Sequence, residues 1–364
     1  QKTGFMSDTS LFSQIALWLD QNVLVATILA VIGAAGVFAL AVACLVLLVR
    51  LTGAIVSSSG TASNRKIRRA AQEPGYSILI GDFGGYSAKQ SRNLIESALA
   101  DYCSDFSFGA QFKLFRVRSP GGRPEGEILT RARKRLEKSG ADMIIWGARL
   151  SDDVDGLRVF GVSRGGALTP QQAQPFTLLL PGRLRNFTDP VRRVAAYLLA
   201  KRLQPALANP ESFREEKVAS LGEILDEILS QLSEMDRPLD EATRREVETD
   251  FSAIVLHLSE TTPQDIWLER LIDRRRATLE ILKGDPNTEA QIDARLDLGR
   301  ALIKRAEVTF DPVAVREASV HLNAAIDALR KHAVIRKAQR ASDALARAQS
   351  LVETRRRFAV NFSA

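Results

Sequence analysis

The chain has 364 residues, of which 45% are apolar, 26% charged and 6% aromatic, and its formal net charge is +7. This composition excludes fibrous and collagen-like proteins. The only two cysteines, Cys44 and Cys103, exclude a disulfide framework and a cysteine metal cluster.

An apolar stretch near the N-terminus sets this chain apart from an ordinary soluble protein. The 27 residues from Val23 to Val49 carry no charged side chain. A membrane-spanning helix needs about 20 residues, whereas the apolar core of a signal peptide has about 7–15. We therefore expect a retained transmembrane helix in residues 22–50, after a short extracytoplasmic or interfacial segment, residues 1–21.

The basic residues that flank this stretch indicate its orientation. Lys2 is the only basic residue before it, whereas five lie between Arg50 and Gly75. Lys and Arg favour the cytoplasmic side. The pattern predicts a single-pass protein of a bacterial inner (plasma) membrane, with its N-terminus outside and its large C-terminal part in the cytoplasm. Alanine and glycine recur at four-residue spacing in the span. Small residues at this spacing let two helices pack closely, so that a homo-oligomer is an alternative to a monomer.

Residues 51–75 read as a flexible, basic linker. Small polar residues fill positions 57–64, and a basic cluster follows them, Arg65, Lys66, Arg68 and Arg69. These four side chains could contact anionic headgroups of the lipid bilayer. Their role in setting the orientation of the membrane span would explain the same four residues without lipid recognition.

Residues 76–185 alternate between short apolar runs and amphipathic stretches. The apolar runs predict strands. After the first and the second of them, apolar residues recur at helical spacing, which predicts a helix in each place. The predicted strands are Ser77–Ile80, Phe112–Val117, Met143–Trp146, Leu157–Val162 and Phe176–Leu180. Because helical crossovers connect the first three, we expect a small βαβαβ unit with parallel strands, followed by a β-hairpin.

The glycines after the first predicted strand suggest one ligand site. Gly81, Asp82, Gly84 and Gly85 lie between a strand and a helix, where a turn of backbone N–H groups could bind an anion. Neither a dinucleotide-binding nor a P-loop signature accompanies them. Ligand or nucleotide sensing by this loop is therefore an alternative function.

Residues 186–364 have an almost purely helical pattern, with about seven helices. Asp189-Pro190, Thr262-Pro263 and Asp311-Pro312 are typical helix starts. Small residues and leucines recur where two of these helices would pack against each other. The residues are Leu298, Gly299, Ala301, Ala318, Leu322 and Ala325.

Two stretches resemble known families. Residues 78–85, the helix after them and residues 140–147 resemble the N-terminal α/β domain of TolB and TolB-like modules that precede tetratricopeptide repeats in bacterial proteins. Residues 298–326 are similar to a tetratricopeptide repeat, although the usual spacing of about 34 residues is not kept. The first resemblance implies an interaction or assembly module without catalytic residues. The second implies a divergent array of two or three helical hairpins.

Residues suited to catalysis or metal binding are few. The only histidines, His257, His321 and His332, all lie in the helical half. Neither Cys-x-x-Cys nor His-Glu-x-x-His occurs. The acidic residues Asp152, Asp153 and Asp155 could ligate Mg²⁺ or Ca²⁺, but they lack the rest of an EF-hand loop and suit a polar turn better. We expect no enzymatic activity, no cofactor and no metal.

The charge distribution completes the functional prediction. Residues 76–185 contain 16 basic and 11 acidic residues, whereas residues 186–364 contain 28 and 29. A near-neutral helical half argues against nucleic-acid binding there. We expect a membrane-anchored, non-catalytic scaffold or assembly protein that binds other proteins. A self-assembling structural component of a membrane-bound ring or lattice is a further alternative.

Overall fold

The computed structural model describes most of the chain after the predicted span. The described residues are 63–85, 88–107, 109–150, 156–167, 169–181, 187–235, 239–261, 265–284 and 288–362. They belong to one structural unit, Val56–Ala364. The predicted span of residues 22–50 and the acidic residues Asp152, Asp153 and Asp155 lie outside them. Within these ranges, no helix combines the length and the apolarity needed to cross a membrane.

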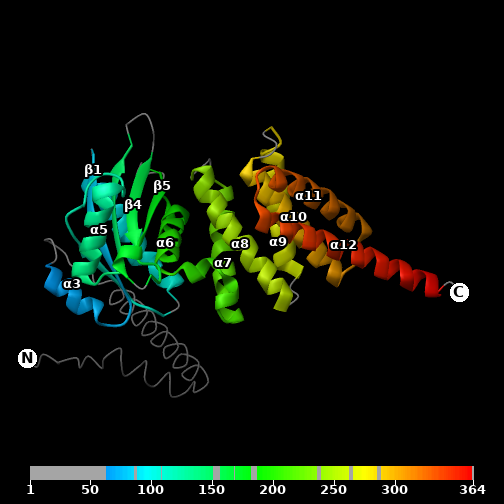
Figure 1. Cartoon of the computed structure of the whole chain (residues 1–364), viewed down its shortest axis with the longest axis horizontal. Helices are drawn as coiled ribbons and strands as arrows, with labels where there is room; N and C mark the ends of the chain where they lie inside the picture. The colour runs from blue at the N-terminus through cyan, green and yellow to red at the C-terminus, as the bar shows by residue number, and fades with distance from the viewer. Residues whose placement is uncertain are drawn as a thin grey trace, which may run out of the picture. The chain divides into compact units, whose positions relative to one another are not determined.

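A five-stranded mixed sheet forms the first half of the described chain (Figure 1). The strands are β1 (Tyr76–Gly84), β2 (Phe112–Arg116), β3 (Met143–Arg149), β4 (Leu157–Ser163) and β5 (Gln174–Leu180). Their order in the sheet is β2-β1-β3-β4-β5. β1 is parallel to β2 and β3, whereas β3, β4 and β5 pair antiparallel. The predicted βαβαβ unit with a following hairpin is therefore confirmed.

Helices cover both faces of this sheet. They are α3 (Asn64–Ala71), α4 (Ala88–Tyr102), α5 (Gly126–Ser139) and α6 (Asp189–Leu203). Ile78 and Ile80 of β1 belong to the same core as α4 and α6, whereas Leu79 belongs to the core that α3 and α5 share. This alternation follows from the period of two residues along a strand. Short 3₁₀ helices are η1 (Cys103–Phe106), η2 (Pro170–Gln172), η4 (Pro205–Ala208) and η5 (Pro210–Ser212).

Helix α3 corrects the predicted linker of residues 51–75, because its last part is folded. The side chain of Ser63 caps the helix by accepting a hydrogen bond of 3.4 Å from the Lys66 backbone N–H. Ile67 is fully buried in the core below α5. One apolar residue among basic neighbours is enough to dock a two-turn helix, a signal too short for periodicity to reveal. The basic side chains Arg65, Lys66, Arg68 and Arg69 are exposed around it.

Six further helices form the second half of the described chain. They are α7 (Glu215–Ser233), α8 (Glu241–Thr261), α9 (Asp265–Ile281), α10 (Glu289–Val308), α11 (Pro312–Lys331) and α12 (Ile335–Phe362). Each helix packs against its neighbour in the sequence, and α10 also contacts α8 and α12. Helices α8, α10 and α12 therefore lie next to one another in one layer.

Helix α6 joins the sheet to the helical half. The predicted boundary at residue 186 groups α6 with the helices, whereas the structure packs it against α4 on the sheet as well as against α7 (Figure 1). The Tyr197 hydroxyl donates to Asp250 Oδ2 of α8 at 2.9 Å, and Lys201 Nζ lies 2.5 Å from the same oxygen. One hydrophobic core extends from the sheet through α6 to α12. The sheet and the helices therefore share a single folded unit.

Candidate functional site

The glycine loop proposed as an anion site is not a loop in the structure. Gly81, Asp82 and Gly84 lie within β1, which continues to Gly84 and pairs with β3 as far as Ala148. A shift in the pairing register between Ile80 and Phe83 accommodates one extra residue in β1. The predicted turn at these positions is therefore wrong. Only Gly85 has a left-handed backbone, with φ of +93°.

Close packing explains the first of these glycines. A Cβ atom on Gly81 would lie 3.1 Å from both Ser119 Cα and Trp146 Cβ. The carboxylate of Asp82 accepts a hydrogen bond of 3.0 Å from Arg92 Nη1 of α4. Gly81 thus permits strand packing, and Asp82 has a basic partner within the domain.

The six repeat-packing residues meet where α10 crosses α11. All six are fully buried. A Cβ atom on Gly299 would lie 2.6 Å from Leu322 Cγ and 3.3 Å from the Ala318 carbonyl oxygen. The absence of a side chain at Gly299 lets the two helices approach closely.

A second pair of the same type, Leu221-Gly222 in α7, escaped the sequence analysis. A Cβ atom on Gly222 would lie 3.0 Å from Ile254 Cγ2 of α8 and 3.6 Å from the ring of Trp267 in α9. Gly222 and Gly299 thus serve the same purpose in two places. Their separation is about twice that of a regular repeat, which hid the relationship.

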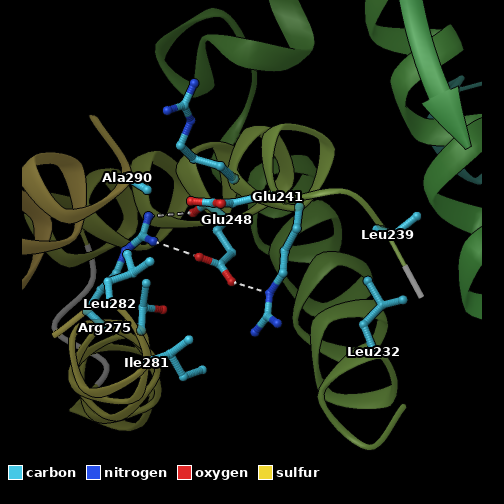
Figure 2. Close-up of a pocket in the computed structure, with 11 residues that line it drawn as sticks. Leu232, Leu239, Glu241, Glu248, Arg275, Ile281, Leu282 and Ala290 are labelled. Atoms are coloured by element: carbon cyan, nitrogen blue, oxygen red, sulfur yellow. Dashed lines mark hydrogen bonds and ion pairs between the residues drawn. The ribbon is translucent and has the colours of Figure 1, made fainter. Parts of the chain in front are cut away.

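An opening in the helical half lies between α7, α8, α9 and α10 (Figure 2). Its volume is about 420 Å³. Five of its lining side chains are apolar, namely Leu232, Leu239, Ile281, Leu282 and Ala290. We call it the α7–α10 cavity. Ile281 is 72% exposed at its edge.

Paired charges form the polar side of the α7–α10 cavity. Arg275 is 2% exposed, and its guanidinium lies 2.9 Å from Glu248 Oε2 of α8. The same guanidinium lies 2.7 Å from Asp297 Oδ2 of α10. Arg244 Nε donates to the other Glu248 oxygen at 2.9 Å, so that two arginines hold one carboxylate (Figure 2). This network fixes three helices around the cavity.

The lining of the cavity contains Thr278 but neither histidine nor cysteine. His257 and His321 lie on α8 and α11, and His332 ends α11; none of them lines the cavity. Burial lowers the pKa of His321, although Glu317 opposes this shift. In the described ranges, no cluster of three or more His, Cys, Asp or Glu side chains is arranged to hold a metal ion.

Sequence reasoning missed the cavity because no local signal marks it. Its lining comes from the ends of four consecutive helices, and its charged residues look like ordinary solvated helix faces.

Comparison with known proteins adds no relative. No protein-family model, no curated protein and no solved structure matches this chain. The resemblance to TolB-like modules and to tetratricopeptide repeats therefore stays a prediction from residue patterns.

Proposed function

We propose that the chain is a membrane-anchored, non-catalytic scaffold that binds a protein partner through the α7–α10 cavity. The observation that carries the proposal is an open, mainly apolar cavity of about 420 Å³ with an exposed isoleucine at its edge. Protein interfaces draw most of their affinity from a few apolar or aromatic side chains that fill such pockets. The expected partner therefore presents one large apolar side chain.

The charged network supports this proposal by keeping the cavity in one shape. Glu248 is held by both Arg244 and Arg275, and Arg275 is held in turn by Asp297. A pocket that is already formed before binding saves the free energy of ordering it. Because these charges are already paired, the polar side of the cavity offers little net charge, and the apolar residues decide what binds.

Membrane attachment belongs to the same proposal. The predicted span of residues 22–50 would anchor the chain in a bacterial inner membrane, and the exposed cluster Arg65, Lys66, Arg68 and Arg69 would lie near anionic headgroups. A partner bound in the cavity would then be held at the cytoplasmic surface. A reporter that is active only in the periplasm is fused to the C-terminus. Activity of this fusion would contradict the proposed orientation.

Site-specific crosslinking in cells tests the cavity directly. A photoreactive amino acid replaces Ile281 in the full chain, and a matched variant carries it at Ile335, which is 79% exposed at the start of α12 and outside the cavity. We expect a crosslinked protein that recurs with position 281 and is absent with position 335. Identical products from both positions, or none from 281, contradict the proposed site.

Ligand sensing by the first strand is tested separately. The full chain in detergent is heated with a panel of nucleotides, alongside the Gly84→Val variant. A Cβ atom at Gly84 would meet nothing closer than 3.9 Å, so that the variant is expected to fold. Strong stabilisation by one nucleotide, lost in the variant, would favour a sensor over a scaffold.

A further inference from the structure

A second, smaller pocket lies in the layer that α8, α10 and α12 form. Its volume is about 120 Å³. Six of its lining residues are charged, namely Glu260, Arg300, Lys304, Arg340, Asp343 and Arg347. We call it the arginine pocket. Arg340, Asp343 and Arg347 follow one another at helical spacing on α12, so that one face of that helix points its charges toward α10.

Positive charge is in excess in the arginine pocket. Four of the six charged residues are cations and two are carboxylates, which leaves two positive charges. Lys304 has partners, since its Nζ lies 3.8 Å from Glu260 and 3.2 Å from Glu307. Asp343 accepts a hydrogen bond of 2.9 Å from Gln339, an uncharged side chain.

The three arginines of the pocket lack the ion pairs that several other arginines of the helical half make. Within the described part of the chain, Arg300, Arg340 and Arg347 have no carboxylate within 4.0 Å, whereas Arg275, Arg276 and Arg305 each hold one on a neighbouring helix. Ion pairs between helices are thus frequent in this half. The arginine pocket is a place where guanidinium groups gather without them.

The environment of Arg300 adds to this picture. Burial lowers the pKa of its guanidinium, and Arg340 and Arg347 lower it further, whereas Asp297 and Glu260 raise it. Three mutually repelling cations, of which Arg300 is partly buried, cost free energy, and an anion placed among them would offset that cost. Guanidinium groups also match phosphate oxygens with two parallel hydrogen bonds.

We propose that the arginine pocket binds a phosphate dianion, either free or as the terminal group of a phosphomonoester. A dianion balances the two excess positive charges, whereas a carboxylate would leave one of them unbalanced. A cavity of about 120 Å³ holds one such group and little more. The pocket shares no lining residue with the α7–α10 cavity, so that this site does not depend on the function proposed above.

Thermal unfolding of the full chain in detergent, with inorganic phosphate titrated against sodium chloride at equal ionic strength, tests this site. We expect saturable stabilisation by phosphate. Arg347→Gln and Arg300→Gln should each weaken the apparent affinity about tenfold, because each removes a charged hydrogen bond. Arg316→Gln is the matched control, since Arg316 is exposed on α11, which contributes no lining residue. Equal stabilisation of all variants, or none beyond that of chloride, overturns the proposal.

Asp343→Asn should strengthen phosphate binding, and it tests the pocket without removing an arginine. Asp343 is exposed, and the substitution removes one of the two carboxylates of the pocket while keeping an acceptor for Gln339. We expect phosphate to bind about fivefold more tightly. Unchanged or weaker binding contradicts the site.

Titration with a phosphomonoester distinguishes a phosphorylated ligand from free phosphate. Phosphoserine is titrated beside inorganic phosphate under the same conditions. Tighter binding of the ester indicates a phosphorylated ligand, and tighter binding of inorganic phosphate indicates the free ion; either result supports the pocket only when Arg347→Gln weakens it. Acetate that stabilises the chain as strongly as phosphate would overturn the preference for a dianion.

Discussion

Arg275 of α9 donates a hydrogen bond of 2.7 Å to Asp297 of α10, within an ion pair that is buried between the two helices. The same guanidinium holds Glu248 of α8 and the Ser252 hydroxyl, which lies 2.8 Å away. One side chain therefore joins three helices that the sequence separates by loops. The first prediction follows from this arrangement.

Replacing Arg275 with methionine should destabilise the protein strongly. Methionine fills much of the same space but leaves the buried carboxylate of Asp297 without this cation and the half-buried Glu248 with Arg244 alone, at a cost of about 3–5 kcal/mol. The neighbouring residue Arg276 is the matched control, because its ion pair with Glu317 is 43% exposed on the arginine side. Arg276→Met should cost less than about 1 kcal/mol. Urea denaturation measures both, and similar losses would contradict the importance of the buried network.

Gly299→Ala should destabilise the contact between α10 and α11. The new methyl group would lie 2.6 Å from Leu322 Cγ, and relieving such an overlap costs about 1–3 kcal/mol. Alanine recovers up to about 1 kcal/mol of helix propensity.

Gly222→Ala provides the comparison for this prediction. Its methyl group would lie 3.0 Å from Ile254 Cγ2, a milder contact that the gain in propensity can nearly cancel. We expect little change in the denaturation midpoint for Gly222→Ala and a clear decrease for Gly299→Ala. The opposite order would show that α10 and α11 pack less tightly than described.

Ile67→Ala tests whether α3 belongs to the folded domain. Ile67 is fully buried against the core below α5, and its truncation should cost about 2–4 kcal/mol. Arg68→Ala is the matched control, because Arg68 is exposed on the same helix. A flexible segment would show no difference between the two variants. Limited proteolysis after residue 63 offers a second readout, since cleavage there should increase only in Ile67→Ala.

The pair of Arg276 and Glu317 should make a small, pH-dependent contribution to stability. The hydrogen bond from Arg276 lowers the pKa of Glu317 below its ordinary value of 4.5, while burial opposes this shift. A carboxyl with a lowered pKa in the folded state stabilises it above its unfolded pKa, and this contribution is lost as the pH falls through the folded pKa.

Comparison of Glu317→Gln with the unmodified chain measures that contribution. We expect a loss of about 0.5 kcal/mol at neutral pH and almost none at about pH 3. High salt should also reduce the difference, because the pair is partly exposed. A difference that grows as the pH falls would contradict the assigned partner.

The sequence was sufficient for the sheet, because its apolar runs are short and separated by turn residues. Ile78 and Ile144 mark central strands through continuous apolar runs, and helical spacing between the strands dictates parallel pairing. The ends of strands were less predictable. Gly81 and Gly84 looked like a turn, yet both lie in β1, which pairs with β3 on either side of Gly81, so that tertiary contact overrode local preference.

The candidate sites could not be predicted in the same way. Arg275, Glu248 and Asp297 look like charges on three solvated helix faces until packing buries Arg275 and Asp297 and half-buries Glu248. Arg300 and Arg347 are 47 positions apart on different helices, and only the contact of α10 with α12 brings them into one pocket. Neighbour relations between non-consecutive helices depend on crossing geometry, which a single sequence leaves undetermined.

The double packing of α6 has a consequence for any attempt to divide the chain. Nine of its 15 residues are buried, and they serve the sheet on one side and α7 and α8 on the other. A truncation before α6 would remove one of the two helices that cover one face of the sheet. A truncation after α6 would leave Tyr197 and Lys201 without Asp250. Neither half is expected to be soluble alone, so that the sheet and the helices must be produced together.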